Sequence, residues 1–245
     1  PVSMAALVII VFFIPYTASG FNACGTLFSS LFGVDYFTAM VISAVVIVLY
    51  TVLGGFLAAS TTDLIQSIIM TIALIIVVFF GIHMAGGWDA VVSNAQALPG
   101  YLSFTQTYDA ASGAANAYTP VTIFSTLAWG LGYFGMPHIL LRFMAIEDVK
   151  KLKTSRRIAS IWVVISMAIA VLIGVVGNGM IHAGALESIP AADSQRIIIK
   201  ISTLLSSYGV LPAIVAGLIL SGILAATMST ADSQLLAASS SISQD

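Results

Sequence analysis

Six long apolar segments occupy most of this chain and leave only short connections between them. They lie at about 3–31, 36–58, 64–86, 119–145, 158–184 and 210–236. Each segment is long enough to cross the roughly 30 Å hydrocarbon layer of a bilayer as an α-helix. Their apolar residues run continuously instead of alternating, so the sequence predicts transmembrane helices and not the strands of a membrane barrel.

Composition points to the same class of protein. Hydrophobic residues make up 59% of the 245 residues and charged residues 7%, whereas a soluble domain contains about 25% charged residues. We therefore predict an all-α polytopic membrane protein with a single transmembrane domain over 1–245. The net charge of −2 provides no basic surface for nucleic acid. The lone Cys24 excludes an intrachain disulfide, and we expect it to be buried as a small residue.

Basic residues predict the orientation in the membrane. Six of the eight lie in or beside the connection at about 146–157, namely Arg142, Lys150, Lys151, Lys153, Arg156 and Arg157. Short basic loops stay in the cytoplasm, so we place this loop there, together with the link at 59–63 and both chain ends. Alternatively, these residues are a solvent-exposed run of charges that says nothing about the orientation.

The loops at about 87–118 and 185–208 are then extracellular. We expect the first to be a plain connector. Within the second, apolar residues recur with helical spacing at 194–207, which predicts an interfacial helix lying on the bundle. No basic region with a cleavage site follows Pro1, so we expect no signal peptide and a numbering that starts inside a longer protein.

The fourth segment contains residues that disfavour a continuous helix. In AWGLGYFGMPH at 128–138, several glycines precede a proline. Relative to alanine, glycine costs a helix about 1 kcal/mol and proline about 3 kcal/mol. We predict a helix break at Gly132, Gly135 and Pro137. Backbone groups freed by such a break can bind an ion or a zwitterion. The alternative is a proline kink with packed aromatic residues, which the same sequence would also produce.

The sixth segment has a polar face. Ala226, Ser229, Thr230 and Ser233 follow helical spacing and share one side of the helix. Their hydroxyl and carbonyl oxygens suit an alkali cation that sheds its water. Alternatively, each hydroxyl donates a hydrogen bond to the carbonyl one turn earlier. This interpretation explains a single hydroxyl better than a cluster that includes Asp232.

Asp63 begins the third segment and has Gln66 three residues later, which is a capping-box arrangement. A carboxylate at the inner mouth of a cation route is a compatible alternative. The three histidines form no evident triad with Ser and Asp, and the chain lacks HExxH and CxxC motifs. We therefore predict no enzyme activity. A channel is also disfavoured, because no repeated filter segment is evident.

Three stretches resemble the sodium/solute symporter family. They are GGFLAASTTDLIQSIIM at 54–70, AWGLGYFGMPHILLRFMA at 128–145 and ILAATMSTADSQLLAASS at 223–240. The second stretch is similar to the sodium/proline symporters in particular. The resemblance implies a LeuT-type fold of two inverted five-helix repeats, of which this chain would hold helices three to eight. The first core helix, which contributes the other half of the sodium site, would precede Pro1.

The family's ion ligands map onto specific residues here. The resemblance implies that sodium is bound by the carbonyl of Ala226 and by Ser229 and Thr230. Some relatives have a second sodium position, which would match Asp63, Ser229 and Ser233. Asp232, discussed above, stands where some members have a hydroxyl. By itself, the chain is expected neither to bind sodium tightly nor to transport.

The resemblance also implies a substrate site and a function. Trp129 and Tyr133 match substrate-site aromatics, Tyr16 matches a tyrosine facing the same cavity, and Met136 replaces a glutamine of the proline transporters. The function implied is sodium-coupled import of L-proline or a related small solute across the cell membrane by alternating access. Na+ is the coupling ion and no cofactor is expected. Another amino acid, a sugar or a carboxylate as substrate, or a sensor or channel on the same scaffold, are the alternatives.

Overall fold

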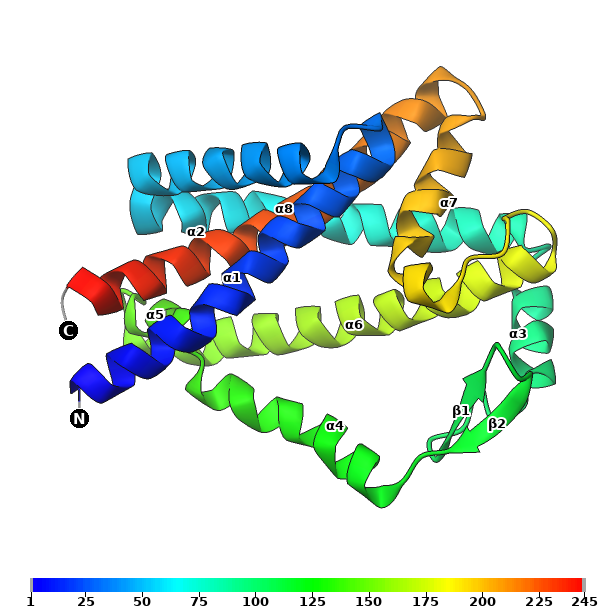
Figure 1. The fold of residues 1–245 in the computed structure, drawn as a ribbon, viewed down its shortest axis with the longest axis horizontal. Helices are drawn as coiled ribbons and strands as arrows, with labels where there is room; N and C mark the ends of the chain where they lie inside the picture. The colour runs from blue at the N-terminus through cyan, green and yellow to red at the C-terminus, as the bar shows by residue number, and fades with distance from the viewer. Residues whose placement is uncertain (1, 244–245) are drawn as a thin grey trace. The chain divides into compact units, whose positions relative to one another are not determined.

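The fold is almost entirely helical, as predicted (Figure 1). The structure is a computed structural model that describes residues 2–243. Its α-helices are α1 (Val2–Phe32), α2 (Tyr36–Met84), α3 (Trp88–Ala97), α4 (Pro120–Gly132), α5 (Pro137–Met144), α6 (Leu152–His182), α7 (Ile197–Ser206) and α8 (Val210–Ser243). Three 3₁₀ helices are η1 (Tyr133–Gly135), η2 (Val149–Lys151) and η3 (Ala191–Arg196).

The chain forms two compact units. The first unit contains Pro1–Thr71, Met136–Leu152 and Leu220–Asp245. The second unit contains Ile72–Gly135 and Lys153–Ile219. Helices α2 and α8 each contribute residues to both units.

Five helical segments within the described residues are long and apolar enough to cross a membrane. They are Ser3–Phe32, Tyr36–Leu57, Ala59–Met84, Val149–His182 and Val210–Ser243. The remaining predicted span, 119–145, is divided among α4, η1 and α5. Large apolar side chains such as Leu53 and Leu57 are 85% and 79% exposed, which fits helices whose outer surface contacts lipid.

The connection between the second and third spans lies earlier than predicted. The residues at 59–63 are helical, so the predicted link there is wrong. The helical path breaks instead at Gly55, whose φ of 56° and ψ of −155° fall in a region open almost only to glycine. Figure 1 shows the chain doubling back within the first unit at this point. Asp63 therefore lies inside a helix, and its predicted role as a helix cap is also wrong.

Small residues bring the helices of the first unit together. Cys24 is buried, as predicted, in a cluster with Ile47 and Ala231. Helix α1 contacts α8 at this cluster. A Cβ atom on Gly20 would lie 3.2 Å from the Cβ of Ala231. This close approach fixes α8, and its polar face, against α1.

The second unit has its own apolar core. Fully buried side chains from four helices meet in it: Val77, Val176, Met180, Ile201 and Ile219. Helix α7 occupies most of the range in which the sequence predicts a helix, and Ile201 anchors it in this core.

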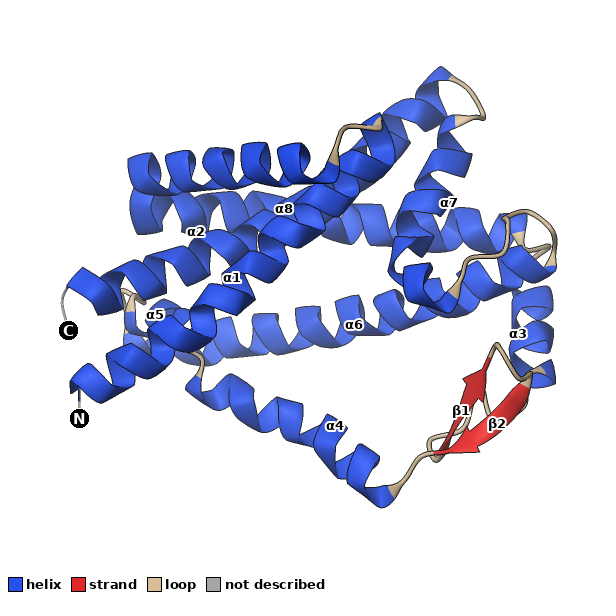
Figure 2. Ribbon diagram, viewed as in Figure 1, coloured by secondary structure: helices blue, strands red, loops and turns tan. Residues whose placement is uncertain are grey.

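The loop at about 87–118, which the sequence predicts to be extracellular, is more structured than predicted. It contains α3 and an antiparallel hairpin of β1 (Gln106–Asp109) and β2 (Ala114–Ala117), which Figure 2 shows in red. Gln106 pairs with Ala117 and Asp109 with Ala114. The prediction of a plain connector is therefore wrong.

Candidate functional site

The chain is interrupted between α4 and α5, within the range where the sequence predicts a break. Helix α4 ends at Gly132, the 3₁₀ turn η1 follows, and Met136 is extended with a ψ of 114°. Pro137 then occupies the start of α5. A proline is tolerated there because the first helical residues need no intrahelical amide donor. The proline thus begins a new helix instead of kinking a continuous one.

The three predicted sodium ligands lie together on α8. The Ser229 hydroxyl donates to the Ala226 carbonyl oxygen across 3.0 Å, and the Thr230 hydroxyl donates to the same oxygen across 3.2 Å. The hydroxyls are therefore bonded back to the preceding turn, which is the alternative reading of the sequence. Each hydroxyl oxygen still carries lone pairs, so a cation would have to replace only the two hydrogen bonds to Ala226.

Arg142 connects two of the residues predicted for a second sodium. Its Nη2 donates to Oδ2 of Asp63 in an ion pair and to the hydroxyl oxygen of Ser233 across 2.7 Å. The Ser233 hydroxyl also lies 2.9 Å from the Ser229 carbonyl oxygen. Asp63 and Ser233 thus both contact the guanidinium group of Arg142. From the sequence, Arg142 is considered only as one of the basic residues that predict the orientation in the membrane.

Asp232 shares the Ser233 hydroxyl with this guanidinium group and also bonds to Tyr50. It is fully buried, and its Oδ2 accepts a hydrogen bond from the Tyr50 hydroxyl across 2.9 Å. Its Oδ1 lies 3.1 Å from the Ser233 hydroxyl. Successive helical residues are rotated by about 100°, so Asp232 points away from the face that carries Ser229 and Thr230, toward α2.

Sequence reasoning missed Arg142 and Tyr50 as members of this cluster. For Arg142 a signal exists, because a charged residue inside an apolar segment requires a partner. For Tyr50 there is none, since a tyrosine in an apolar helix is ordinary. The polar cluster of the first unit therefore consists of Tyr50, Asp63, Arg142, Asp232 and Ser233.

The predicted substrate residues fall in different units. Tyr16 lies in the first unit, where its ring centroid is 6.0 Å from that of His138. Trp129 and Tyr133 lie in the second unit and are 72% and 47% exposed. Their joint role in binding a substrate stays a prediction.

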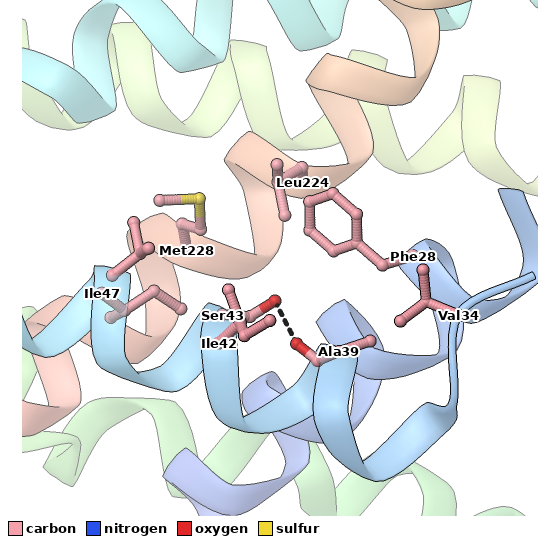
Figure 3. A pocket seen from close by; sticks show the side chains of 9 residues that line it. Phe28, Val34, Ala39, Ile42, Ser43, Ile47, Leu224 and Met228 are labelled. Carbon is pink, nitrogen blue, oxygen red and sulfur yellow. Dashed lines mark hydrogen bonds between the residues drawn. The ribbon is translucent and has the colours of Figure 1, made fainter. Parts of the chain in front are cut away.

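A cavity of about 240 Å³ in the first unit does not suit an ion or a zwitterion (Figure 3). Apolar side chains line it, including Phe28, Ile47 and Leu224. Ser43 also contributes to the lining, but its hydroxyl is already bonded to the Ala39 carbonyl across 2.8 Å. The cavity therefore presents an apolar wall.

The chain is similar to several known proteins. The family model described as "Sodium:solute symporter family" matches residues 1–245. The "Osmoregulated proline transporter OpuE" of Bacillus subtilis (strain 168) is 39% identical over 242 residues, which cover 99% of this chain and 46% of that protein. The "High-affinity proline transporter PutP" of the same organism is 41% identical over 244 residues, covering 98% of this chain and 47% of that protein.

A third relative is the "Sodium/proline symporter" of Staphylococcus aureus (strain USA300 / TCH1516). It is 36% identical over 242 residues, which cover 99% of this chain and 44% of that protein. The chain thus spans about half the length of the curated relatives it matches. No solved structure matches it.

Proposed function

We propose, from the premise that this chain belongs to the sodium:solute symporter family, that the protein carrying it is a sodium-coupled symporter for L-proline or a related small solute. The family resemblance seen in the sequence is confirmed by the family model. The names of the similar proteins, two proline transporters and a sodium/proline symporter, support the choice of solute. The protein would act in the cell membrane.

The observation that carries this proposal is the family match over residues 1–245. Ser229, Thr230 and the Ala226 carbonyl oxygen, which lie together on α8, are its candidate ion ligands. Three neutral oxygens on one turn of an apolar helix provide part of a coordination shell for a small monovalent cation. Helix α8 presents them in the half of the helix that belongs to the first unit. A second helix would complete the shell.

The interruption between α4 and α5 supports a solute site. Backbone amides and carbonyls freed at a helix break can bind the charged ends of an amino acid. Trp129 and Tyr133 are four residues apart, so they share a face of the chain beside this break. We propose that Trp129 and Tyr133 contact the apolar body of the solute, while the role of Tyr16 stays an expectation from the family resemblance.

Coupling requires no covalent chemistry. Sodium and the solute each bind one conformation of the carrier more tightly than the other, so each raises the affinity for its partner. We therefore assign no catalytic residue and no cofactor, and we propose Na+ as the coupling ion. Alternating access follows from the two conformations.

The test is uptake of labelled L-proline by vesicles that contain a full-length protein carrying this chain. We expect an inward sodium gradient to stimulate uptake, and the double substitution Ser229→Ala with Thr230→Ala to abolish the stimulation. Thr227→Ala is the matched control, since its hydroxyl also bonds back one turn, to Ile223, but lies off the Ser229 face. The proposal would be refuted if the sodium gradient did not stimulate uptake, or if the double substitution left the stimulation unchanged.

The same assay identifies the solute. Unlabelled amino acids, sugars and carboxylates are added in excess, and L-proline or a close analogue is expected to compete best. A sensor would bind proline without transporting it, and a channel would pass sodium without the solute.

A further inference from the structure

Phe104 is the most exposed of the large apolar side chains that the structure describes, at 99%. It immediately precedes Thr105, whose carbonyl oxygen accepts a hydrogen bond from the Tyr118 amide across 2.8 Å. Phe104 and Tyr118 therefore both lie at the open end of the β1–β2 hairpin, and Tyr118 and the nearby Leu102 are exposed as well. We call Leu102, Phe104 and Tyr118 the apolar base of the hairpin.

The opposite end of the hairpin is polar. At the turn, the Ser112 hydroxyl and the Ala111 amide donate to the Asp109 carboxylate across 2.7 and 2.9 Å. Asp89 and Asp109 are the only charged residues in the sequence range 87–118. The hairpin thus carries its charge at the turn and its exposed apolar side chains at the base. Exposed apolar patches of this kind mark sites of interaction.

The start of the loop is held where two membrane-spanning segments end. These segments end at Met84 and at His182. Asn94 of α3 donates to Asn178 of α6 across 2.8 Å, and Asn178 is about one helical turn from His182. Trp88, the first residue of α3, is exposed at this level. Helix α3 therefore lies at the membrane surface, where tryptophan is enriched.

The hairpin is connected to the membrane surface at both of its ends. A Cβ atom on Gly100 would lie 2.8 Å from the Cβ of Ala115, so the link after α3 packs on the hairpin. After β2, the Thr119 hydroxyl caps α4 by accepting a hydrogen bond from the Thr122 amide across 3.2 Å (Figure 2). Helix α4 contains no charged residue and begins the remaining predicted span. The apolar base thus lies between two segments that meet the membrane.

We propose that the apolar base of the hairpin inserts into the interfacial layer of the bilayer, so that the loop is a membrane anchor. Aromatic side chains are favoured in this layer, which is apolar on one side and hydrated on the other. Because the range 87–118 has no basic residue, the contact is apolar and needs no anionic lipid. The anchor holds the start of α4 at the membrane surface. This inference concerns the lipid and not the transported solute.

The experiment measures the depth of spin labels in a full-length protein carrying this chain, reconstituted in phosphatidylcholine vesicles. A nitroxide is attached to Phe104→Cys after every native cysteine, including Cys24, has been replaced. Power-saturation EPR compares collisions with oxygen, which concentrates in lipid, with collisions with a water-soluble nickel chelate. We expect oxygen collisions to dominate for this label. Ala111→Cys, at the exposed turn of the same hairpin, is the matched control, where nickel collisions should dominate.

The proposal would be overturned if the nickel chelate reached the labels on Phe104→Cys and Ala111→Cys equally, because the base would then be in water. A label on Phe104→Cys that neither reagent reaches would also overturn it, since another part of the protein would then cover the base. Adding phosphatidylglycerol should leave the depth unchanged, and a deeper label in the anionic vesicles would refute an apolar contact. If Phe104→Cys does not fold, the same measurement on Leu102→Cys decides the matter. These readouts do not depend on transport, so the proposed symport function is tested separately.

Discussion

Tyr50 on α2 donates its hydroxyl hydrogen to Oδ2 of Asp232 on α8 across 2.9 Å, and Asp232 is fully buried. The bond joins two helices of the first unit through a carboxylate in a membrane-spanning segment. Unpaired polar groups in such an environment are costly. The bond therefore ties the polar half of α8 to α2.

Tyr50→Phe tests this connection. The substitution keeps the ring and leaves one buried carboxylate oxygen without its donor, which costs about 1–3 kcal/mol. We expect a lower free energy of unfolding in detergent, measured by denaturant titration. Tyr208→Phe is the control, because Tyr208 is exposed and its hydroxyl donates to the weak acceptor Sδ of Met84 at 3.5 Å. Equal stability of both variants would contradict the role of Tyr50.

Gly55→Ala tests the backbone at the break in α2. Nothing lies within 4 Å of a Cβ built at Gly55, so the expected penalty comes from the positive φ and not from a clash. Residues held in such regions cost about 1–3 kcal/mol each. We expect reduced thermal stability of Gly55→Ala in detergent. Gly174→Ala, at an equally open position inside α6, should cause no loss, because alanine favours a helix.

A third prediction concerns the amide pair between α3 and α6. Nδ2 of Asn94 donates to Oδ1 of Asn178 across 2.8 Å, and Asn94 is buried. A double-mutant cycle of Asn94→Ala and Asn178→Ala should give a coupling energy of about 1 kcal/mol. Denaturant unfolding of the two single variants and the double variant provides the measurement. Strict additivity would show that the pair does not hold α3 to α6.

These features differ in how far the sequence could predict them. Apolar run length and helical periodicity are local properties, so they predicted the membrane helices and α7. Low helix propensity at Gly132, Gly135 and Pro137 is local too, and the chain is interrupted within that range. The break at Gly55 has no comparable signal, because glycines inside apolar helices more often serve packing.

The polar cluster could not be predicted from local sequence. Arg142 is 79 residues from Asp63 and 91 from Ser233 along the chain. Nothing in a single sequence reveals a contact at that separation. The hairpin was missed for another reason: each strand has only four residues, and β2 consists of alanine and asparagine, which are poor strand formers. Its turn signals were Asp109, Ser112 and Gly113, and Gly113 adopts a φ of 67°.

We expect the stability of the hairpin turn, which lies outside the membrane-spanning segments, to depend on pH. Hydrogen bonds from the Ser112 hydroxyl and the Ala111 amide hold the pKa of Asp109 below its usual value of 3.8. A depressed folded pKa means that these bonds stabilise the turn above pH 3.8 and that the stabilisation is lost as the pH falls through the folded pKa. The ¹³C shift of the Asp109 carboxyl carbon should therefore titrate below 3.8. Ser112→Ala should raise the midpoint, and Ser103→Ala should leave it unchanged.

Pro137→Ala tests whether the interruption between α4 and α5 serves solute binding. Alanine restores a backbone donor and removes the bias of Met136 toward an extended conformation. Helix α4 can then continue toward α5. The backbone groups proposed to bind the solute would instead form hydrogen bonds within the helix. In vesicles with a full-length protein carrying this chain, we expect about a tenfold loss of kcat/KM for L-proline, equivalent to about 1.4 kcal/mol.

The same variant separates the two proposed sites. The Ala226, Ser229 and Thr230 oxygens lie on α8 and do not depend on the backbone at Pro137. The sodium concentration that gives half-maximal uptake should therefore change less than twofold, apart from the thermodynamic coupling between the ligands. Pro120→Ala, which replaces the proline at the start of α4, is the matched control. If Pro137→Ala weakened sodium and solute equally, the interruption would support the whole carrier and not the solute site.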